Sequence, residues 1–216
     1  TQRSGQRYFD ADQNPLTSPE TSVHQIVFIT GASSGLGQAL ALRFYRAGYT
    51  LALVARRIND LQTWVNAQGI HAERCRIYSA DVAVPSSIIA AGHGCLRDLG
   101  TPDVVIANAG ISIGMDSAIE SDLDVMTRTL ATNLVGVAAT FHPFLPKMTS
   151  RGSGRLVGIG SVAGIRGLPG HGAYCASKAG VISYCESLRG ELRSSGVKAV
   201  TISPGYIDTP LTQRNT

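Results

Sequence analysis

Short apolar runs alternate with longer segments of mixed polarity along most of the chain. Each run is almost continuously apolar, as in strands that are buried on both faces of a parallel sheet. Between the runs, apolar residues recur at the spacing of amphipathic helices. Strands that alternate with helices predict an α/β fold, with a single doubly wound parallel sheet flanked by helices. The runs cover residues 25–30, 50–54, 76–80, 102–107, 154–160 and 197–203.

The predicted helices fill the segments between these runs. Asn59 and Asp60 are interpreted as a cap of the second helix, and Gly92 and Gly94 weaken the prediction that the third is continuous. Doubly wound sheets bind ligands outside the carboxyl ends of their strands, so residues that follow the strands are candidates for a site. The predicted helices cover residues 39–45, 60–68, 85–99, 122–147 and 173–188.

The chain divides into a short arm and one domain. Residues 1–22 are polar, contain Pro15 and Pro19, and show little periodicity. We interpret them as a flexible N-terminal arm or as a remnant of an expression vector. Residues 23–216 are expected to form one dinucleotide-binding domain, because a chain of 216 residues suffices for one sizeable core. A hydrophobic fraction of 44% and a charged fraction of 16% are typical of a well-packed globular protein.

The charges and the cysteines argue against several classes of function. The net charge is +4 and the basic residues are scattered, so nucleic-acid binding is not expected. The four cysteines lack metal-ligand spacing, and we predict free thiols in a reducing cytoplasm and no metal site. No apolar run approaches the ~20 residues that span a bilayer, and the N-terminus has no signal-peptide core. We therefore expect a soluble cytoplasmic protein without membrane partners.

A glycine-rich turn follows the first predicted strand and leads directly into the first helix. This arrangement points backbone N–H groups and a helix N-terminus at a pyrophosphate, and glycines let the phosphates approach closely. The alternative is a plain glycine-rich turn. We predict a cofactor loop of the Rossmann type, formed by Gly31, Ser33, Ser34, Gly35, Leu36 and Gly37.

Two arginines follow the second predicted strand, in the sequence Ala55-Arg56-Arg57. Dinucleotide folds that prefer NAD place a carboxylate near this strand end, where it binds ribose hydroxyls. Arg56 and Arg57 instead offer guanidinium groups, which suit a 2′-phosphate through charge-assisted hydrogen bonds. The sequence therefore favours NADP(H) over NAD(H). The alternative is a solvated arginine pair at a helix start.

Tyr174 and Lys178 are four residues apart at the start of the last predicted helix. This spacing places them on one helix face. A free phenol has a pKa near 10, and an ammonium group beside it favours the phenolate. The two residues are therefore a candidate acid/base pair, although the same spacing occurs by chance on many helices.

The motifs together resemble the short-chain dehydrogenase/reductase family over about residues 23–211. Residues 30–37 match its Thr-Gly-x-x-x-Gly-x-Gly loop, and Ala107 replaces the first Asn of its Asn-Asn-Ala-Gly motif. The resemblance implies a catalytic tetrad of Asn133, Ser161, Tyr174 and Lys178. It also implies cofactor contacts from Asp81, Val82, Asn108, Ala109, Gly110, Tyr174, Lys178, Pro204, Gly205, Ile207 and Thr209.

In the role that this resemblance implies, Tyr174 protonates the substrate oxygen and Ser161 hydrogen-bonds it. Lys178 lowers the pKa of Tyr174 and binds the nicotinamide ribose, while Asn133 holds a water. The implied reaction is NADP(H)-dependent hydride transfer to or from a small-molecule carbonyl or secondary alcohol. Two alternatives remain: a non-catalytic protein that senses NADP(H), and an enzyme that epimerises or dehydrates sugar nucleotides with the same Tyr/Lys pair.

The resemblance also bears on assembly and on the substrate. It implies a homodimer or homotetramer that uses the helices carrying Asn133 and Tyr174. Family members continue past Pro204-Gly205 with a substrate-covering segment and a last strand; we expect either that the sequence is incomplete here or that the protein lacks these parts. The loop over residues 162–171 is expected to line the substrate pocket, where Arg166 either meets an acidic substrate or faces solvent.

Overall fold

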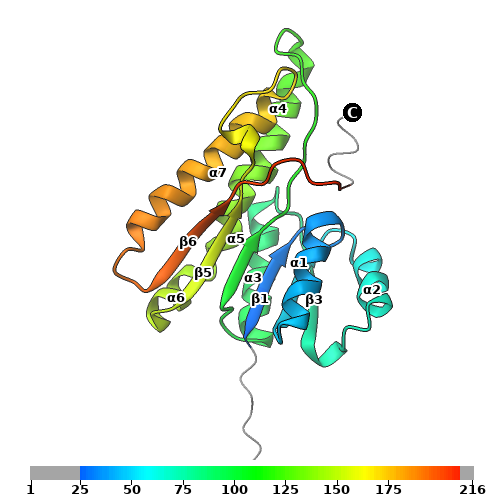
Figure 1. Ribbon diagram of the computed structural model, residues 1–216, viewed down its shortest axis with the longest axis vertical. Helices are drawn as coiled ribbons and strands as arrows, with labels where there is room; N and C mark the ends of the chain where they lie inside the picture. The colour runs from blue at the N-terminus through cyan, green and yellow to red at the C-terminus, as the bar shows by residue number, and fades with distance from the viewer. Residues whose placement is uncertain (1–24, 210–216) are drawn as a thin grey trace, which may run out of the picture.

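The computed structural model describes residues 25–209, and the arm predicted over residues 1–22 lies outside them. Within the described residues, six parallel strands form one sheet in the order β3-β2-β1-β4-β5-β6 (Figure 1). The connections reverse direction between β1 and β4, which is where doubly wound sheets open a crevice for a ligand. The predicted fold class is confirmed.

The strands agree with the predicted apolar runs to within two residues at either end. β1 lies in the middle of the sheet, because Val27 pairs with Leu51 on one side and with Val104 on the other. The strand bounds are Ile26–Thr30 (β1), Thr50–Ala55 (β2), Cys75–Ser79 (β3), Val104–Ala107 (β4), Gly154–Ile159 (β5) and Val197–Ile202 (β6).

Helices cover both faces of this sheet, with α1 and α2 on one face and α3, α5 and α7 on the other (Figure 1). None of the helices in the described part of the chain is long and apolar enough to cross a bilayer. The α-helix bounds are Gly35–Arg46 (α1), Ile58–Ala67 (α2), Pro85–Asp98 (α3), Leu123–Leu130 (α4), Gly136–Phe141 (α5), Leu145–Arg151 (α6) and Gly172–Glu191 (α7). Short 3-10 helices cover Ala72–Arg74, Glu120–Asp122 and Val162–Gly164.

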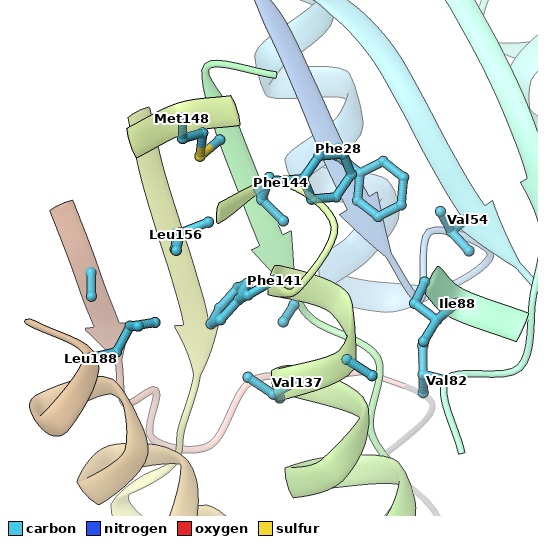
Figure 2. Close-up of a cluster of buried hydrophobic side chains, with 14 of the residues drawn as sticks. Phe28, Val54, Val82, Ile88, Val137, Phe141, Phe144, Met148, Leu156 and Leu188 are labelled. Atoms are coloured by element: carbon cyan, nitrogen blue, oxygen red, sulfur yellow. The ribbon is translucent and has the colours of Figure 1, made fainter. Parts of the chain in front are cut away.

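Alternate residues of each strand fill two apolar layers. In β1, Phe28 belongs to the layer under α3, α5 and α7, whereas Val27 and Ile29 belong to the layer under α1 and α2. Figure 2 shows the first layer, in which Phe28 packs against Phe144 with ring centroids 4.8 Å apart. Each fully buried side chain of this size contributes ~1.5–3 kcal/mol. Helices and sheet are held together by these two layers, and because the strands are parallel their carboxyl ends lie at the same edge of the sheet.

The continuous helix predicted over residues 122–147 is wrong. α4 is followed by a π-helix over Ala131–Val135 and then by α5, which ends at Phe141. Pro143 has no backbone N–H to donate and its ring clashes with the preceding turn, so the helix stops and α6 begins after it. The sequence pattern concealed this break because Phe141 and Phe144, on either side of it, are both buried in the same layer.

The predicted cap of α2 is also wrong. Arg57 occupies the N-cap position and makes no capping hydrogen bond with its side chain, so Asn59 and Asp60 lie inside the first turn. The Asp60 carboxylate instead pairs with the Arg57 guanidinium at 2.6 Å.

The two glycines of α3 do not interrupt that helix. A side chain at Gly92 would collide with the Pro143 ring, and an added Cβ at Gly94 would lie 3.2 Å from the Tyr78 ring. Gly92 is therefore required by the packing of α3 on Pro143, whereas Gly94 lies in tight contact with the Tyr78 ring.

Candidate active site

A cavity of about 910 Å³ opens at the carboxyl ends of the strands. The turns that follow all six strands contribute to its wall, as expected for the crevice of a doubly wound sheet. Gly37 and Asn133 lie behind the wall, whereas the other predicted site residues are brought together along it. These are Gly31, Ser33, Ser34, Gly35, Leu36, Arg56, Arg57, Asp81, Val82, Asn108, Ala109, Gly110, Ser161, Tyr174, Lys178, Pro204, Gly205, Ile207 and Thr209.

The glycine turn after β1 brings the start of α1 up to the cavity. Gly31 has a φ of +67°, a left-handed conformation that favours glycine, and an added Cβ would lie 2.8 Å from the Cα atom of Ala109. At Gly37 an added Cβ would collide with the Gly31 carbonyl oxygen, so the first turn of α1 packs directly on the loop. The first N–H groups of a helix have no partner within the helix, so this helix start is suited to an anionic phosphate.

Thr30 and Asn108 tie this turn to the turn after β4. The Thr30 hydroxyl accepts hydrogen bonds from the backbone N–H groups of Asn108 and Ala109, both at 3.1 Å. The Asn108 side-chain amide donates to the Thr30 carbonyl oxygen at 2.9 Å. Asn108 therefore positions the cavity wall with its own side chain, and Thr30, which was not among the predicted site residues, is its partner.

Arginine–carboxylate pairs occupy the end of the cavity formed by β2 and β3. Arg56 lies 3.6 Å from a carboxylate oxygen of Asp81, and Arg57 pairs with Asp60. The other Asp81 oxygen accepts a hydrogen bond from the Ala83 N–H at 3.0 Å. The predicted phosphate-binding arginines thus line the cavity, but each already has an acidic partner, which the sequence pattern did not indicate.

Ser161 and Tyr174 meet on the cavity wall, although 12 residues separate them in the chain. β5 delivers Ser161 and the first turn of α7 delivers Tyr174. Burial raises the pKa of Tyr174 above its usual value, and a hydrogen bond with Ser161 opposes that rise. The predicted lowering of the Tyr174 pKa by Lys178 is therefore not found, and the phenol is protonated at neutral pH.

Lys178 is buried one helical turn beyond Tyr174. Its ammonium nitrogen donates to the Ile159 carbonyl oxygen at 2.7 Å and lies 5.7 Å from the centroid of the Tyr174 ring. Burial lowers the pKa of Lys178 to about 8. The ammonium is thus held by the end of β5 rather than by the phenol, which explains why it does not lower the Tyr174 pKa here.

Asn133 lies in the π-helix behind the wall and is fully buried. Its side chain accepts from the Ile111 N–H and donates to the Ile111 carbonyl oxygen, both at 2.8 Å. It also donates to the Ser177 hydroxyl at 3.0 Å, and Ser177 donates in turn to the Tyr174 carbonyl oxygen at 2.7 Å. Asn133 and Ser177 therefore link the turn after β4 to the helix that carries Tyr174. The water-holding role of Asn133 stays a prediction.

We expect Ser177→Ala to lower the free energy of unfolding by about 1–3 kcal/mol, because it deprives a buried amide of one partner. Urea denaturation of the purified protein measures this change. Ser187→Ala is the matched control on the same helix, since Ser187 is exposed and its hydroxyl contacts only Glu191 among the described residues. An equal loss of stability in both variants would contradict the structural role of Ser177.

One wall of the cavity was not predicted. Residues 127–132 form a helical wall on which Thr127, Arg128, Ala131 and Thr132 line the cavity at helical spacing, but these residue types give no distinctive sequence signal. Conversely, the loop over residues 162–171 does not line the cavity, and Arg166 is exposed outside it. The wall residues that were missed are Val54, Ala55, Ala80, Ala83, Ile111, Ser112, Ile113, Thr127, Arg128, Ala131, Thr132, Ile159 and Gly160.

The family model described as short chain dehydrogenase matches residues 25–216. The chain belongs to the short-chain dehydrogenase family. This assignment confirms the resemblance and makes the protein an oxidoreductase that uses a nicotinamide cofactor to transfer a hydride to or from alcohol and carbonyl groups. The match includes the whole region that builds the cavity.

Two relatives illustrate how this short-chain dehydrogenase compares with known sequences. An uncharacterized oxidoreductase of Myxococcus xanthus is 37% identical over 195 residues, which are 89% of this chain and 76% of the relative. A dehydrogenase/reductase SDR family protein 7-like of Anopheles gambiae is 38% identical over 87% of this chain. The chain spans 60% of the length of that second relative.

Solved structures of the family show the same fold with either nicotinamide cofactor. A short-chain dehydrogenase/reductase from Burkholderia phymatum in complex with NAD is 27% identical, with a TM-score of 0.82 over 89% of this chain and 69% of its own. A serine dehydrogenase complexed with NADP+ is 28% identical, with a TM-score of 0.81 over 88% of this chain and 76% of its own.

The cysteines of this short-chain dehydrogenase do not form part of the cavity wall. All four, Cys75, Cys95, Cys175 and Cys185, are buried free thiols. Burial raises the pKa of Cys75 to about 11, so its thiol is unreactive at neutral pH. No cluster of three or more His, Cys, Asp or Glu side chains suited to a metal ion occurs among residues 25–209.

Proposed function

We propose that this short-chain dehydrogenase is NADP(H)-dependent and acts on a carbonyl or secondary alcohol of a small molecule. The observation that carries the proposal is the meeting of Ser161, Tyr174 and Lys178 on the wall of the cavity that the glycine turn also lines. An acid/base pair of this kind has no purpose in a protein that only binds the cofactor.

The cavity fits a nicotinamide dinucleotide. Its volume of about 910 Å³ lies within the range of small-molecule and cofactor sites. The start of α1 offers N–H groups to a pyrophosphate, and Gly31 lets the turn that leads to it pack closely on Ala109. Arg56 and Arg57 offer guanidinium groups to a 2′-phosphate at the end of β2.

The bound nicotinamide supplies the hydride that reduces the carbonyl carbon. Tyr174 carries a proton at neutral pH, because burial raises its pKa, and its hydroxyl donates that proton to the carbonyl oxygen. The Ser161 hydroxyl, which is hydrogen-bonded to Tyr174, forms a hydrogen bond with the same carbonyl oxygen. The Lys178 ammonium, one helical turn beyond Tyr174 on the same wall, would bind the ribose of the nicotinamide and so position it beside these groups. In the oxidative direction the same groups act in reverse.

The cofactor preference is tested by replacing Arg56. We expect Arg56→Ala to weaken NADPH binding about tenfold or more and to change NADH binding by less than about threefold, because only NADPH carries the 2′-phosphate. Titration of NADPH and NADH fluorescence against the purified protein measures both affinities. Arg43→Ala, at an exposed position of α1 outside the cavity wall, is the matched control. Equal affinities of the unaltered protein for the two nucleotides would contradict the proposed preference.

We also propose a cytoplasmic homo-oligomer, a dimer or a tetramer, that assembles through the helical segment carrying Asn133 and through α7, which carries Tyr174. The four free cysteines support a reducing compartment. The assembly is supported by an apolar surface groove of about 310 Å³, in which Val135 is 47% exposed. The groove is lined by Ile89, Val135, Ala138, Ala139, His142, Leu145 and Tyr184.

A further inference from the structure

The short 3-10 turn Val162–Gly164 follows Ser161 directly and fixes its orientation. Ser161 is the N-cap residue of this turn, and its hydroxyl accepts a hydrogen bond from the backbone N–H of Ala163 at 3.2 Å. The Gly164 N–H donates to the Ser161 carbonyl oxygen at 2.9 Å. The turn therefore holds both the backbone and the hydroxyl of Ser161, so that a movement of the turn also moves the hydroxyl.

Gly164 is the point at which this turn meets the backbone of α7. An added Cβ at Gly164 would lie 2.7 Å from the carbonyl carbon of Lys178 and 2.8 Å from the amide nitrogen of Ala179. Both are backbone atoms of the helix, so no side chain can rotate away to make room. Gly164 is not among the glycines with a positive φ. The close approach, rather than a left-handed backbone, is therefore what requires glycine here.

The part of α7 that Gly164 touches belongs to the candidate acid/base pair. Lys178 contributes its backbone to this contact, and its ammonium donates to the Ile159 carbonyl oxygen at 2.7 Å. Tyr174, one helical turn earlier, forms a hydrogen bond with Ser161. The hydrogen bond between Ser161 and Tyr174 thus joins two elements that pack on each other through Gly164. The spacing between the turn and the helix sets whether the Ser161 hydroxyl reaches the phenol.

We propose that Gly164 is a positioning residue for the hydride transfer, because it sets the spacing between the turn that follows Ser161 and the helix that carries Tyr174 and Lys178. This inference rests on the proposed function, since it requires Ser161 and Tyr174 to act together on the carbonyl oxygen. Gly164 does not line the cavity and touches no reacting atom. A side chain at Gly164 would move the Ser161 hydroxyl relative to Tyr174 without removing either group.

Gly164→Ala tests this spacing with the smallest added group. We expect it to lower kcat about 10–100-fold, because small displacements of reacting groups have effects of this size. The affinity for NADPH should change by less than about threefold, because the glycine turn and the paired arginines belong to other elements. The measurement is NADPH oxidation with a panel of aldehydes and ketones that begins with 4-nitrobenzaldehyde and cyclohexanone. Gly167→Ala is the matched control and should leave kcat unchanged, since a Cβ at this exposed position of the same loop meets no atom within 4 Å.

A double substitution separates positioning from a general loss of structure. Ser161→Ala removes the hydroxyl that Gly164 is proposed to position, so adding Gly164→Ala to that variant should lower kcat by less than about threefold further. Losses that multiply in the double variant overturn the inference, and so does an unchanged kcat in Gly164→Ala. If Gly164→Ala does not fold, Ala163→Gly replaces it, because it loosens the same turn without adding an atom. Its kcat should fall at least about threefold while Ser161 is present and not in the Ser161→Ala background; any other result overturns the inference.

The outcomes also separate this inference from the proposed function. If Tyr174→Phe abolishes turnover while Gly164→Ala behaves like Gly167→Ala, the proposed function stands and only the role of Gly164 falls. If the unaltered protein oxidises NADPH with no carbonyl compound of the panel, both fall together.

Discussion

Tyr174→Phe is expected to lower kcat by about 10²–10⁴-fold while leaving the affinity for NADPH nearly unchanged. The substitution removes one hydroxyl and keeps the ring, so the packing at the start of α7 is preserved. Without that hydroxyl the side chain that meets Ser161 can no longer donate a proton to the carbonyl oxygen. NADPH oxidation, followed at its absorbance with a panel of aldehydes and ketones, measures the loss, and fluorescence titration checks that the cofactor still binds.

Tyr206→Phe is the matched control for this substitution. Tyr206 is 89% exposed and lies next to the cavity without lining it, so the loss of its hydroxyl should change kcat by less than about twofold. Retained turnover in Tyr174→Phe would exclude the proposed acid. If the unaltered protein binds NADPH but none of the aldehydes and ketones leads to its oxidation, the sensing protein or the sugar-nucleotide enzyme becomes the better interpretation. Neither of these consumes the cofactor.

The fold could be predicted from the sequence wherever one physical signal acted alone. Buried parallel strands must be apolar on both faces, and each predicted strand was found. The helix over residues 122–147 failed because two signals conflicted there. Its apolar positions continue in helical register past Phe141, but Pro143 ends the helix through its missing N–H. The π-helix around Asn133 has no sequence signature at all.

The candidate site could be predicted as a set of residues but not as a set of contacts. Four-residue spacing on one helix placed Tyr174 beside Lys178, and the strand ends placed Asp81 and Arg56 at the same edge of the sheet. The partners of these groups come from elsewhere in the fold: Lys178 donates to the Ile159 carbonyl oxygen at the end of β5. Long-range hydrogen bonds to the backbone leave no trace in a side-chain pattern. The predicted direction of the Tyr174 pKa shift was therefore wrong, although the residue itself reached the cavity wall.

The buried charge of Lys178 lowers the stability of the folded protein. Burial lowers its pKa from 10.5 to about 8, because the ammonium is poorly solvated in the folded protein. Between these pH values the unfolded chain binds more protons than the folded one, so stability should rise with pH from about 8 to 10.5 and be lowest below that window. At neutral pH the penalty is on the order of 3 kcal/mol, reduced by the hydrogen bond to Ile159.

Lys178→Met should therefore make the cofactor-free protein more stable and the enzyme almost inactive. We expect the free energy of unfolding at pH 7 to rise by about 1–3 kcal/mol, since methionine fills a similar volume without a charge, and kcat to fall at least about a hundredfold. Denaturant unfolding at pH 7 and pH 10 tests the cause, because the advantage of the variant should shrink as the native lysine loses its proton. Lys198→Met, at an exposed position of β6, should show neither effect. A Lys178→Met protein that is less stable than the unaltered protein at both pH values would show that the ammonium contributes more through the Ile159 hydrogen bond than it loses through burial.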